Sequence, residues 1–444
     1  MDFYVETLGC PKNLVDAQAM ARTLESMGHR AVDDPRRADL LLVNTCGFVD
    51  DARRESLAAL RRLAHAKRRG QWLVAAGCLS QYWGDSLSGR SPGIDALLGT
   101  RRWSEIGALL SELERVPARP GRGVPSRLGD PLEATDTAGA GYARQGASAY
   151  LKIADGCSAP CAFCAIPLIK GPASSRPVEA IVSEAAGLVR QGVREIVLVA
   201  QDTTAYGRDR GEPDALPGLI DAILQAAPDL HWLRLMYTYP GHVSPRLVER
   251  MAGDARVCHY LDLPLQHAHP AVLRRMVRPP DVDRTRRLVG DLRAAMPDLA
   301  LRSTFIVGFP GETDEEFQAL AGFLEEVRFD HVGVFRYSPE DGTAAAALPG
   351  PVPEQIKAER YEWLMGLQQQ ISRERNAAQV GRTLQVLVEG QGDGLTVGRS
   401  YRDAPEVDGL VLFPGEIGVG EIVPVQITGA AEYDLFGEAE VEAV

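Results

Sequence analysis

Alternation between short apolar strands and amphipathic helices is the feature that most restricts how this chain can fold. Near the N-terminus, strand and helix patterns alternate in the order 2–10, 13–28, 38–48, 51–69 and 71–79. An alternation of this kind builds a mostly parallel sheet with helices on its faces. We therefore predict an open, doubly wound α/β sheet domain over residues 1–114.

A second alternation begins at Ala149. The preceding residues 115–147 are dense in Pro, Gly, Ala and Arg, and they predict a linker or an ordered crossing loop. Six strand patterns follow, at 149–155, 194–202, 232–240, 258–267, 299–311 and 330–340, with helical patterns such as 177–192 and 313–327 between them. Repeated βα units predict a partial or full TIM-type barrel of parallel strands over residues 148–375.

The chain ends in short strand patterns separated by Gly and Pro turns. A long helical pattern at 354–379 precedes strand patterns at 382–390, 395–400, 410–415 and 421–430. Short, closely spaced strands predict a small antiparallel β-barrel or sandwich over residues 376–444. The predicted fold class is therefore an α/β multidomain protein with an open α/β sheet, a partial (βα) barrel and a small β-barrel.

The charge balance narrows the class of partner. The 444 residues carry 48 Lys and Arg against 60 Asp and Glu, a net charge of −12. In residues 376–444, three arginines (Arg382, Arg399 and Arg402) face twelve carboxylates, so this segment alone contributes −9. Such a surface repels phosphate and attracts a basic protein, which argues against a protein that coats nucleic acid. The absence of a signal-peptide pattern and of a long apolar run predicts a cytoplasmic protein with no membrane partner.

Three of the seven cysteines follow predicted strands. Cys10, Cys46 and Cys78 each stand where a strand ends and a loop begins, in TLGC, VNTC and AAGC. Because the carboxyl ends of parallel strands form one edge of a sheet, we expect these thiols to converge. The alternative is three separate core cysteines.

A second set of cysteines lies in GCSAPCAFC, where Cys157, Cys161 and Cys164 have C-x3-C-x2-C spacing. Three thiolates on one loop can hold three irons of a four-iron, four-sulfur cluster. The next cysteine in the chain is Cys258, so one iron is left without a nearby protein ligand. Zinc is the alternative, but a structural zinc site usually takes four ligands in two pairs.

The cysteine loop after a barrel-type strand resembles the radical S-adenosylmethionine enzymes. The resemblance implies that the amine and carboxylate of S-adenosylmethionine bind the open iron, and that cleavage of the sulfonium yields a 5′-deoxyadenosyl radical. It also implies that Phe163 lies against the adenine, with loop packing as the alternative role. Gln201, Asp202 and Gln266, at later strand ends, are candidate residues of the cofactor pocket.

The resemblance to one radical family, the methylthiotransferases, covers nearly the whole chain. TLGCPKNLVDAQ, VNTCGFV and AAGCLSQ are similar to that family's N-terminal motifs, and the C-terminal strands are similar to its TRAM domain. The resemblance implies that Cys10, Cys46 and Cys78 hold a second four-iron cluster, which carries the inserted sulfur. One S-adenosylmethionine then donates a methyl group and another supplies the radical. Cys258 is left as a core residue.

Two substrate classes compete within this family: adenosine in tRNA, and an aspartate β-carbon of ribosomal protein uS12. Pro-Lys-Asn after Cys10, Gln-Asp-Thr-Thr at 201–204, LRLMYTYPGH and GRSYRDAPEVDG resemble the uS12 branch. The tRNA alternative predicts a basic C-terminal domain, and a third alternative is a non-catalytic iron–sulfur redox or interaction protein. The motifs specify neither the sulfur donor nor the reductant.

Other polar residues near the strand ends have weaker assignments. GFPGET (308–313) lacks the Lys-Ser/Thr of a phosphate loop, so we expect it to shape the cofactor pocket. His267 and His269 are expected to pack or to support other residues rather than to bind metal, because the two clusters require no histidine.

Overall fold

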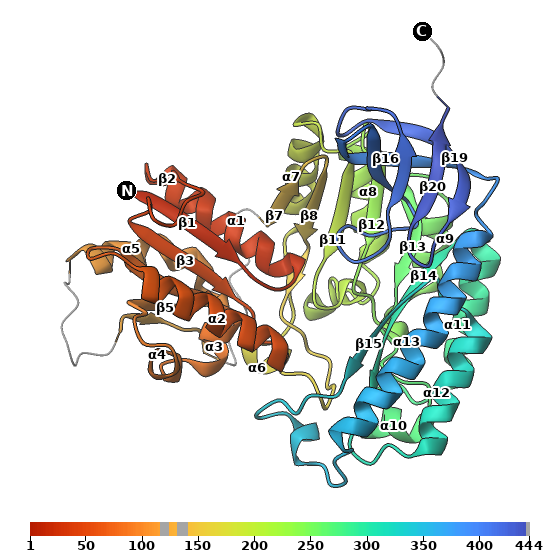
Figure 1. Ribbon diagram of the computed structural model, residues 1–444, viewed down its shortest axis with the longest axis horizontal. Coiled ribbons are helices and arrows are strands. Elements are labelled where there is room, and N and C mark those ends of the chain that lie inside the picture. Colours follow the sequence, from red (N-terminus) through yellow and green to blue (C-terminus); the bar gives the residue numbers. More distant parts are fainter. Residues whose placement is uncertain (116–123, 131–140, 441–444) are drawn as a thin grey trace.

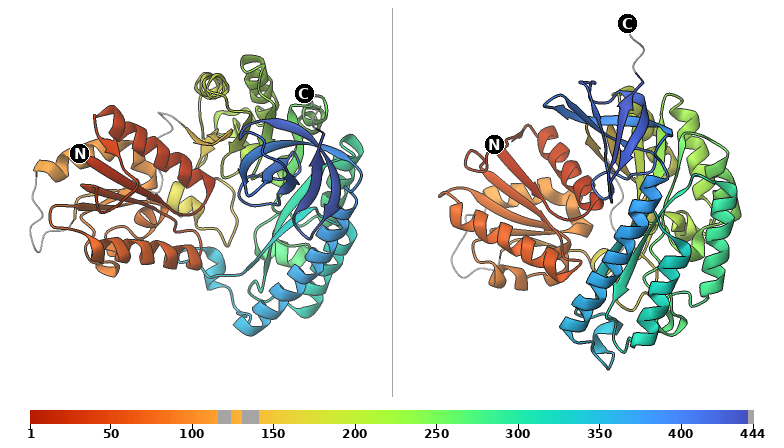
Figure 2. Two further views of the ribbon diagram at one scale, coloured as in Figure 1. Left: turned by 45° about the horizontal axis from the view of Figure 1, so that its top comes forward. Right: turned by 45° about the vertical axis from the view of Figure 1, so that its right-hand side comes forward.

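The computed structural model describes residues 1–115, 124–130 and 141–440, which form three units (Figure 1). The N-terminal α/β unit lies beside a large sheet lined by helices, and a small barrel covers one end of that sheet (Figure 2). In the described residues, no helix is both long and apolar enough to cross a membrane.

The N-terminal unit contains a six-stranded sheet in which every pairing is parallel, as predicted. The strand order is β2-β1-β3-β4-β5-β6. These strands are β1 (Asp2–Thr7), β2 (Arg30–Ala31), β3 (Leu40–Thr45), β4 (Trp72–Gly77), β5 (Ala96–Gly99) and β6 (Ser126–Arg127). The helices are α1 (Pro11–Ser26), α2 (Asp50–Ala66), α3 (Cys78–Trp83), α4 (Ser86–Arg90) and α5 (Ile106–Arg115), with a 3-10 turn η1 (Thr100–Glu105).

Helices cover both faces of this sheet, which explains the continuous apolar runs in its strands. Leu40 and Leu42 of β3 pack against α1 and α5, whereas Leu41 and Val43 pack against α2 and α3. Successive residues of a strand point to opposite faces, so a strand covered on both sides needs apolar residues throughout.

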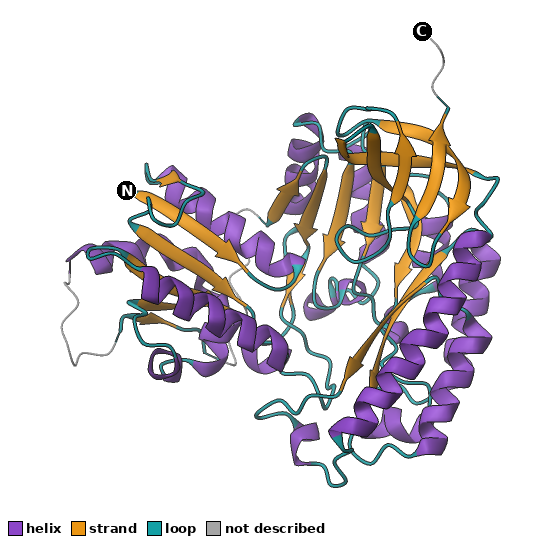
Figure 3. Ribbon diagram, viewed as in Figure 1, coloured by secondary structure: helices purple, strands orange, loops and turns teal. Residues whose placement is uncertain are grey.

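The central unit is built on a seven-stranded open sheet in the order β15-β14-β13-β12-β11-β8-β7 (Figure 3). The six predicted strands are parallel neighbours, which makes the barrel a partial one. They are β8 (Ser148–Lys152), β11 (Glu195–Val199), β12 (Trp232–Leu235), β13 (Val257–Asp262), β14 (Ala300–Val307) and β15 (His331–Arg336). The helices are α7 (Val178–Arg190), α8 (Leu216–Ala226), α9 (Pro245–Ala252), α10 (Pro270–Arg275), α11 (Val282–Ala295), α12 (Asp314–Val327) and α13 (Glu354–Ala377). Short elements complete the unit: β9 (Ala154–Asp155), α6 (Ile166–Lys170), β10 (Ser174–Ser175), η2 (Thr203–Ala205), η3 (Arg208–Arg210), η4 (Pro240–His242) and η5 (Ala344–Ala347).

The two faces of this sheet have different neighbours. Leu198 and Leu233 belong to the outer core, which the helices of the unit cover. Tyr150, on the inner face, shares a core with Val15 of α1 and with Leu387 of the C-terminal barrel. All three units therefore meet on the inner face of the open sheet.

The segment predicted to be a linker contains two short strands that its composition did not indicate. Its β6 joins the N-terminal sheet, and β7 (Tyr142–Gln145) pairs antiparallel with β8. Ladder hydrogen bonds to a neighbouring strand order these residues without any apolar period in the sequence. Much of the remaining segment, 116–123 and 131–140, lies outside the described residues.

The C-terminal unit is a closed five-stranded barrel, as its short strand patterns predicted. Its β18–β20 pairing is parallel, whereas the other pairings are antiparallel. The fifth strand, β20, was not predicted from the sequence. The strands are β16 (Thr383–Gly392), β17 (Leu395–Ser400), β18 (Val411–Pro414), β19 (Ile422–Ala430) and β20 (Leu435–Ala439).

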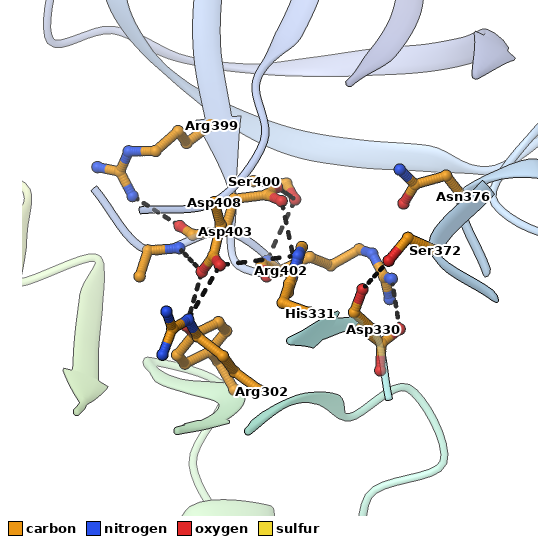
Figure 4. Close-up of polar contacts among 12 residues, drawn as sticks. Arg302, Asp330, His331, Ser372, Asn376, Arg399, Ser400, Arg402, Asp403 and Asp408 are labelled. Carbon is orange, nitrogen blue, oxygen red and sulfur yellow. Dashed lines mark hydrogen bonds and ion pairs between the residues drawn. The ribbon is translucent and has the colours of Figure 1, made fainter. Parts of the chain in front are cut away.

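Buried ion pairs attach the C-terminal barrel to the open sheet. Arg402 reaches Asp330 at 2.7 Å, and Arg302 Nε lies 3.3 Å from Asp408 Oδ1 (Figure 4). On the neighbouring strands, Glu195 binds both Arg399 at 2.6 Å and Arg234 at 2.7 Å. Buried charges of this kind hold two surfaces in one register, because each must keep its partner.

Replacement of Glu195 by glutamine is expected to lower the free energy of unfolding by about 3–5 kcal/mol, because two buried arginines lose their carboxylate. Although burial opposes ionisation, Arg399 and Arg234 lower the pKa of Glu195 from 4.5 to about 2. A carboxylate whose pKa is lowered in the folded state makes its full contribution to the free energy of unfolding at pH values above its ordinary pKa. This contribution is lost as the pH falls toward the folded-state pKa. Urea unfolding should therefore show the difference between wild type and Glu195→Gln shrinking below about pH 4.5.

The exposed Glu416 of the C-terminal barrel offers a matched control, since Glu416→Gln makes the same chemical change at a residue that is not buried. A Glu195→Gln difference that stayed constant between neutral and acidic pH would contradict the assigned ion pair.

Candidate functional site

The three strand ends of the N-terminal sheet bring Cys10, Cys46 and Cys78 together, as predicted. Gly9 has φ +89°, and a Cβ added there would lie 2.7 Å from Cys46 Cβ and 2.8 Å from Cys46 Sγ. Only glycine accommodates both this backbone conformation and this close approach. The loop that carries Cys10 therefore lies directly against the Cys46 side chain.

Asn13, one turn into α1, joins the loops of this site. Its Nδ2 donates to the carbonyls of Leu8 at 3.0 Å and Thr45 at 3.1 Å. Its Oδ1 accepts from Cys78 Sγ at 3.5 Å. Asn13 belongs to the Pro-Lys-Asn stretch after Cys10, so that motif has a structural role at the cysteine site.

Burial dominates the electrostatics of these thiols. It raises the pKa of both Cys46 and Cys78, and the neighbouring Cys10 thiol raises each further. The Lys170 ammonium, from the central unit, acts in the opposite direction on Cys78. Buried thiols become ligands only where positive charge compensates the thiolates, as iron does in a cluster.

The second cysteine set lies on the loop after β9. The Cys157 N–H donates to the Gly171 carbonyl at 3.0 Å, and the Cys164 N–H donates to the Cys161 carbonyl at 3.2 Å. Burial raises the pKa of Cys157, and that of Cys164 to about 12, and the other thiols of the loop add to both shifts. The three thiols are thus electrostatic neighbours on one folded loop.

Each cysteine site offers three thiols as its donor set. Three thiolates can hold three irons of a cuboidal 4Fe–4S cluster. This donor set fits a 4Fe–4S cluster with one iron left open.

The four predicted cofactor-pocket residues lie in different surroundings. Phe163 is half-buried and packs against a hydrophobic cluster that contains Phe309 and Tyr337. Asp202 accepts from Thr204 Oγ1 at 2.6 Å and lies 2.8 Å from His242 Nδ1, so its carboxylate shapes its own loop. Their roles toward a cofactor remain predictions.

Gln201 and Gln266 are half-buried at strand ends, as expected. Gln266 has φ +74°, and its backbone bonds to Thr304 and Ile306 of β14. A positive φ in a residue other than glycine is strained, and this strain is retained because the bonds on both sides fix the turn. Strain of this kind is common at ligand sites, and the role of Gln266 in a cofactor pocket stays a prediction.

The GFPGET turn and the two histidines have supporting contacts. Glu312 accepts from the Gly308 N–H at 3.0 Å and pairs with Arg360 at 2.7 Å, so this carboxylate occupies the turn. His267 is buried with Nε2 3.5 Å from Glu312, and its Nδ1 accepts from the His269 N–H at 3.0 Å. Burial lowers the pKa of His267, which favours a neutral packing residue.

Two contacts near the cysteine sites were not predicted from the sequence. Arg278 Nη1 lies 3.7 Å from Cys161 Sγ, and the same guanidinium lies over the Tyr239 ring. Lys12 Nζ lies 3.4 Å from the ring centroid of Tyr237, across the boundary between two units. Lys12 stands two residues after Cys10 in the sequence, but no local pattern indicated that it contacts Tyr237 or that Arg278 lies near Cys161.

The short helix α6 links the two cysteine sites across the boundary between the N-terminal and central units. Cys78 packs with Ala165 and Ile169, and α6 begins at Ile166, two residues after Cys164. One short segment of the central unit therefore follows one thiol site and contacts the other.

Family models match each of the three units. They are the Uncharacterized protein family UPF0004 at residues 2–99, the Radical SAM superfamily at 151–324 and the TRAM domain at 380–439. A solved radical S-adenosylmethionine methyltransferase, TsrM from Kitasatospora setae, shares the fold with a TM-score of 0.56 and 16% identity, over 89% of this chain and 80% of that one. The fold and the cysteine loop define a radical S-adenosylmethionine enzyme.

Closer relatives identify the family. Ribosomal protein uS12 methylthiotransferase RimO from Roseiflexus sp. (strain RS-1) is 53% identical, over 99% of this chain and 97% of its own length. The protein of the same name from Chloroflexus aurantiacus is 51% identical, over 99% of this chain and 100% of its own. The chain belongs to the RimO family of radical S-adenosylmethionine methylthiotransferases.

Proposed function

We propose that this enzyme replaces a β-hydrogen of an aspartate in ribosomal protein uS12 with a methylthio group. The observation that carries the proposal is the pair of cysteine sites, each with three buried or half-buried thiols, linked by α6, which follows Cys164 and contacts Cys78. A radical enzyme that also inserts sulfur needs a site for each task. The same function in full-length relatives supports the assignment, and a ribosomal protein substrate favours a cytoplasmic enzyme.

Cys157, Cys161 and Cys164 would hold one 4Fe–4S cluster, and Cys10, Cys46 and Cys78 a second. When bound, the clusters and S-adenosylmethionine would supply a radical, which abstracts a hydrogen atom, together with the sulfur and the methyl group that take the place of that atom. Phe163, Gln201, Asp202 and Gln266 are the proposed cofactor contacts. The sulfur donor and the reductant would come from other proteins or small molecules.

This chain's own residues orient and enclose the reacting groups. Asn13 fixes the loops of the N-terminal site, and Arg278 fixes Cys161 at the other. The substrate aspartate must reach the boundary between the two units, where the buried residues of α6 exclude water. Exclusion of water protects a radical from side reactions.

The C-terminal barrel supports a basic protein as the substrate. Arg399 and Arg402 are buried toward the open sheet, so Arg382 is the one exposed cation among the described residues of 380–440. The exposed carboxylates of the barrel are Glu389, Asp393, Glu406, Glu416, Glu421, Glu438 and Glu440. With seven exposed carboxylates and one exposed cation among these residues, the outer face is acidic, and it opposes tRNA binding.

An anaerobic assay tests the proposal directly. Reconstituted enzyme with S-adenosylmethionine and reductant should add one methylthio group to uS12, located on an aspartate by tandem mass spectrometry. The same enzyme should leave tRNA unmodified. Modification of tRNA alone would contradict the substrate, and failure to cleave S-adenosylmethionine would favour a non-catalytic iron–sulfur protein.

A further inference from the structure

Four charged side chains are buried together at the boundary between the N-terminal and central units. They are Asp16 of α1, Lys152 of β8, Asp155 of β9 and Lys170 of α6, and we call them the buried charge cluster. Their side chains are between 1% and 6% exposed. Charged groups this deeply buried are rare in proteins unless they are paired.

Asp16 connects the two units through both ammonium groups of this cluster. One of its oxygens binds Lys152, and the other accepts from Lys170 Nζ at 3.2 Å. Asp155 lies on the far side of the same ammonium groups, 3.0 Å from Lys152 Nζ and 3.0 Å from Lys170 Nζ. A carboxylate of the N-terminal unit thus completes a charge network whose other three members belong to the central unit.

Three members of the buried charge cluster are close in sequence to a cysteine of the proposed sites. Asp16 is on the helix that begins directly after Cys10, and Asp155 is two residues before Cys157. Lys170 ends the short helix that follows Cys164. Because few rotatable bonds separate each of these charged residues from the nearby cysteine, a shift of the charged residue also shifts the thiol.

A second set of bonds holds α6 in the same place. Arg101 of η1 donates from Nε to the Ile169 carbonyl at 2.8 Å and from Nη2 to the Leu168 carbonyl at 3.0 Å. Cys78 also packs against Ile169. The N-terminal unit therefore contacts the backbone carbonyls of α6, its apolar residue Ile169 and the Lys170 ammonium.

We propose that Asp16 is a positioning residue that fixes the N-terminal cysteine site against the radical site through the buried charge cluster. This inference rests on the proposed function, in which a substrate radical formed at one site must meet the sulfur held at the other. An apolar boundary can slide by an ångström at little cost, whereas a buried carboxylate shared by two ammonium groups has one arrangement. A misplacement of about 1 Å can cost a reaction about 100-fold.

Asp16→Asn tests the proposal in the fully reconstituted enzyme. The substitution keeps the side-chain shape and removes the charge that links the units. We expect 5′-deoxyadenosine formation from S-adenosylmethionine to stay near wild type and methylthiolated uS12 to fall about 100-fold. Because positioning is the cause, the magnetic coupling between the two reduced clusters, measured by pulsed electron paramagnetic resonance, should weaken or broaden.

Two further variants separate positioning from a general loss of stability. Arg402→Met breaks another buried ion pair between units, remote from the cysteines, and should leave the cluster coupling unchanged. Asp16→Asn combined with Lys152→Met removes opposite charges together and should restore part of the coupling and of the product.

An unchanged cluster coupling in Asp16→Asn would overturn the proposal, as would equal losses of 5′-deoxyadenosine and product. The coupling measurement requires no turnover, so it remains decisive if wild-type enzyme fails to modify uS12. That failure would refute the proposed function instead.

Discussion

Release of 5′-deoxyadenosine from S-adenosylmethionine is expected to cease when Cys161 is replaced by alanine. Cys161 is the middle thiol of its loop, and two remaining thiolates cannot hold three irons of a cluster. Loss of an outer-sphere partner costs a metal site roughly 10–100-fold. Removal of a direct ligand should exceed that range and leave no detectable product.

The measurement is chromatography of the nucleoside after anaerobic incubation with reductant, together with the iron content of the reconstituted protein. Cys258→Ala is the matched control, because it makes the same chemical change at a cysteine that is buried in the core of the open sheet. That variant should retain the wild-type yield of nucleoside. Continued nucleoside release by Cys161→Ala would refute the assignment of this loop as the radical site.

Local pattern in the sequence predicted most of the fold. The strand patterns at 2–10, 38–48 and 71–79 predicted β1, β3 and β4 of the N-terminal sheet, and helices cover both faces of that sheet. The cysteines at the ends of these three strands could be placed together, since parallel strands end at one edge. The short strands that were missed include β2 and β5 of the N-terminal sheet, β6 and β7 in the predicted linker, and β20 after the last predicted strand.

Buried charges explain what the sequence could not predict. Asp16, Lys152 and Lys170 look like surface residues in the sequence, because charged side chains are almost always exposed. They are buried because segments far apart in the chain supply their partners, as in the pairing of Asp16 with Lys152 across 136 residues. No local period records such a pairing.

The C-terminal arginines are a second case in which the sequence did not show which charged side chains are buried. The charge count of residues 376–444 correctly predicted an acidic domain, but it treated all three arginines as part of the surface. Arg399 and Arg402 instead turn inward to Glu195 and Asp330. The direction of a side chain depends on a partner in another unit, so composition gave the sign of the surface charge but not its magnitude.

Replacement of Cys78 by alanine should produce the opposite pattern of loss from Cys161→Ala. Cys78 is the first residue of α3, and alanine is a strong helix former, so the helix should persist. The thiol is one of three proposed ligands of the second cluster, and its loss should remove about four of roughly eight irons. We expect 5′-deoxyadenosine formation to continue while methylthiolation of uS12 is abolished.

The comparison of the two variants tests whether the cysteine sites divide the chemistry between them. Nucleoside, iron and modified uS12 are measured on the same preparations, again with Cys258→Ala as the control. If Cys78→Ala lost nucleoside formation as completely as Cys161→Ala, the two sites would not act separately. If Cys78→Ala still modified uS12, the sulfur would not come from the N-terminal site. Retained nucleoside with lost product is the result that assigns the radical to one site and the sulfur to the other.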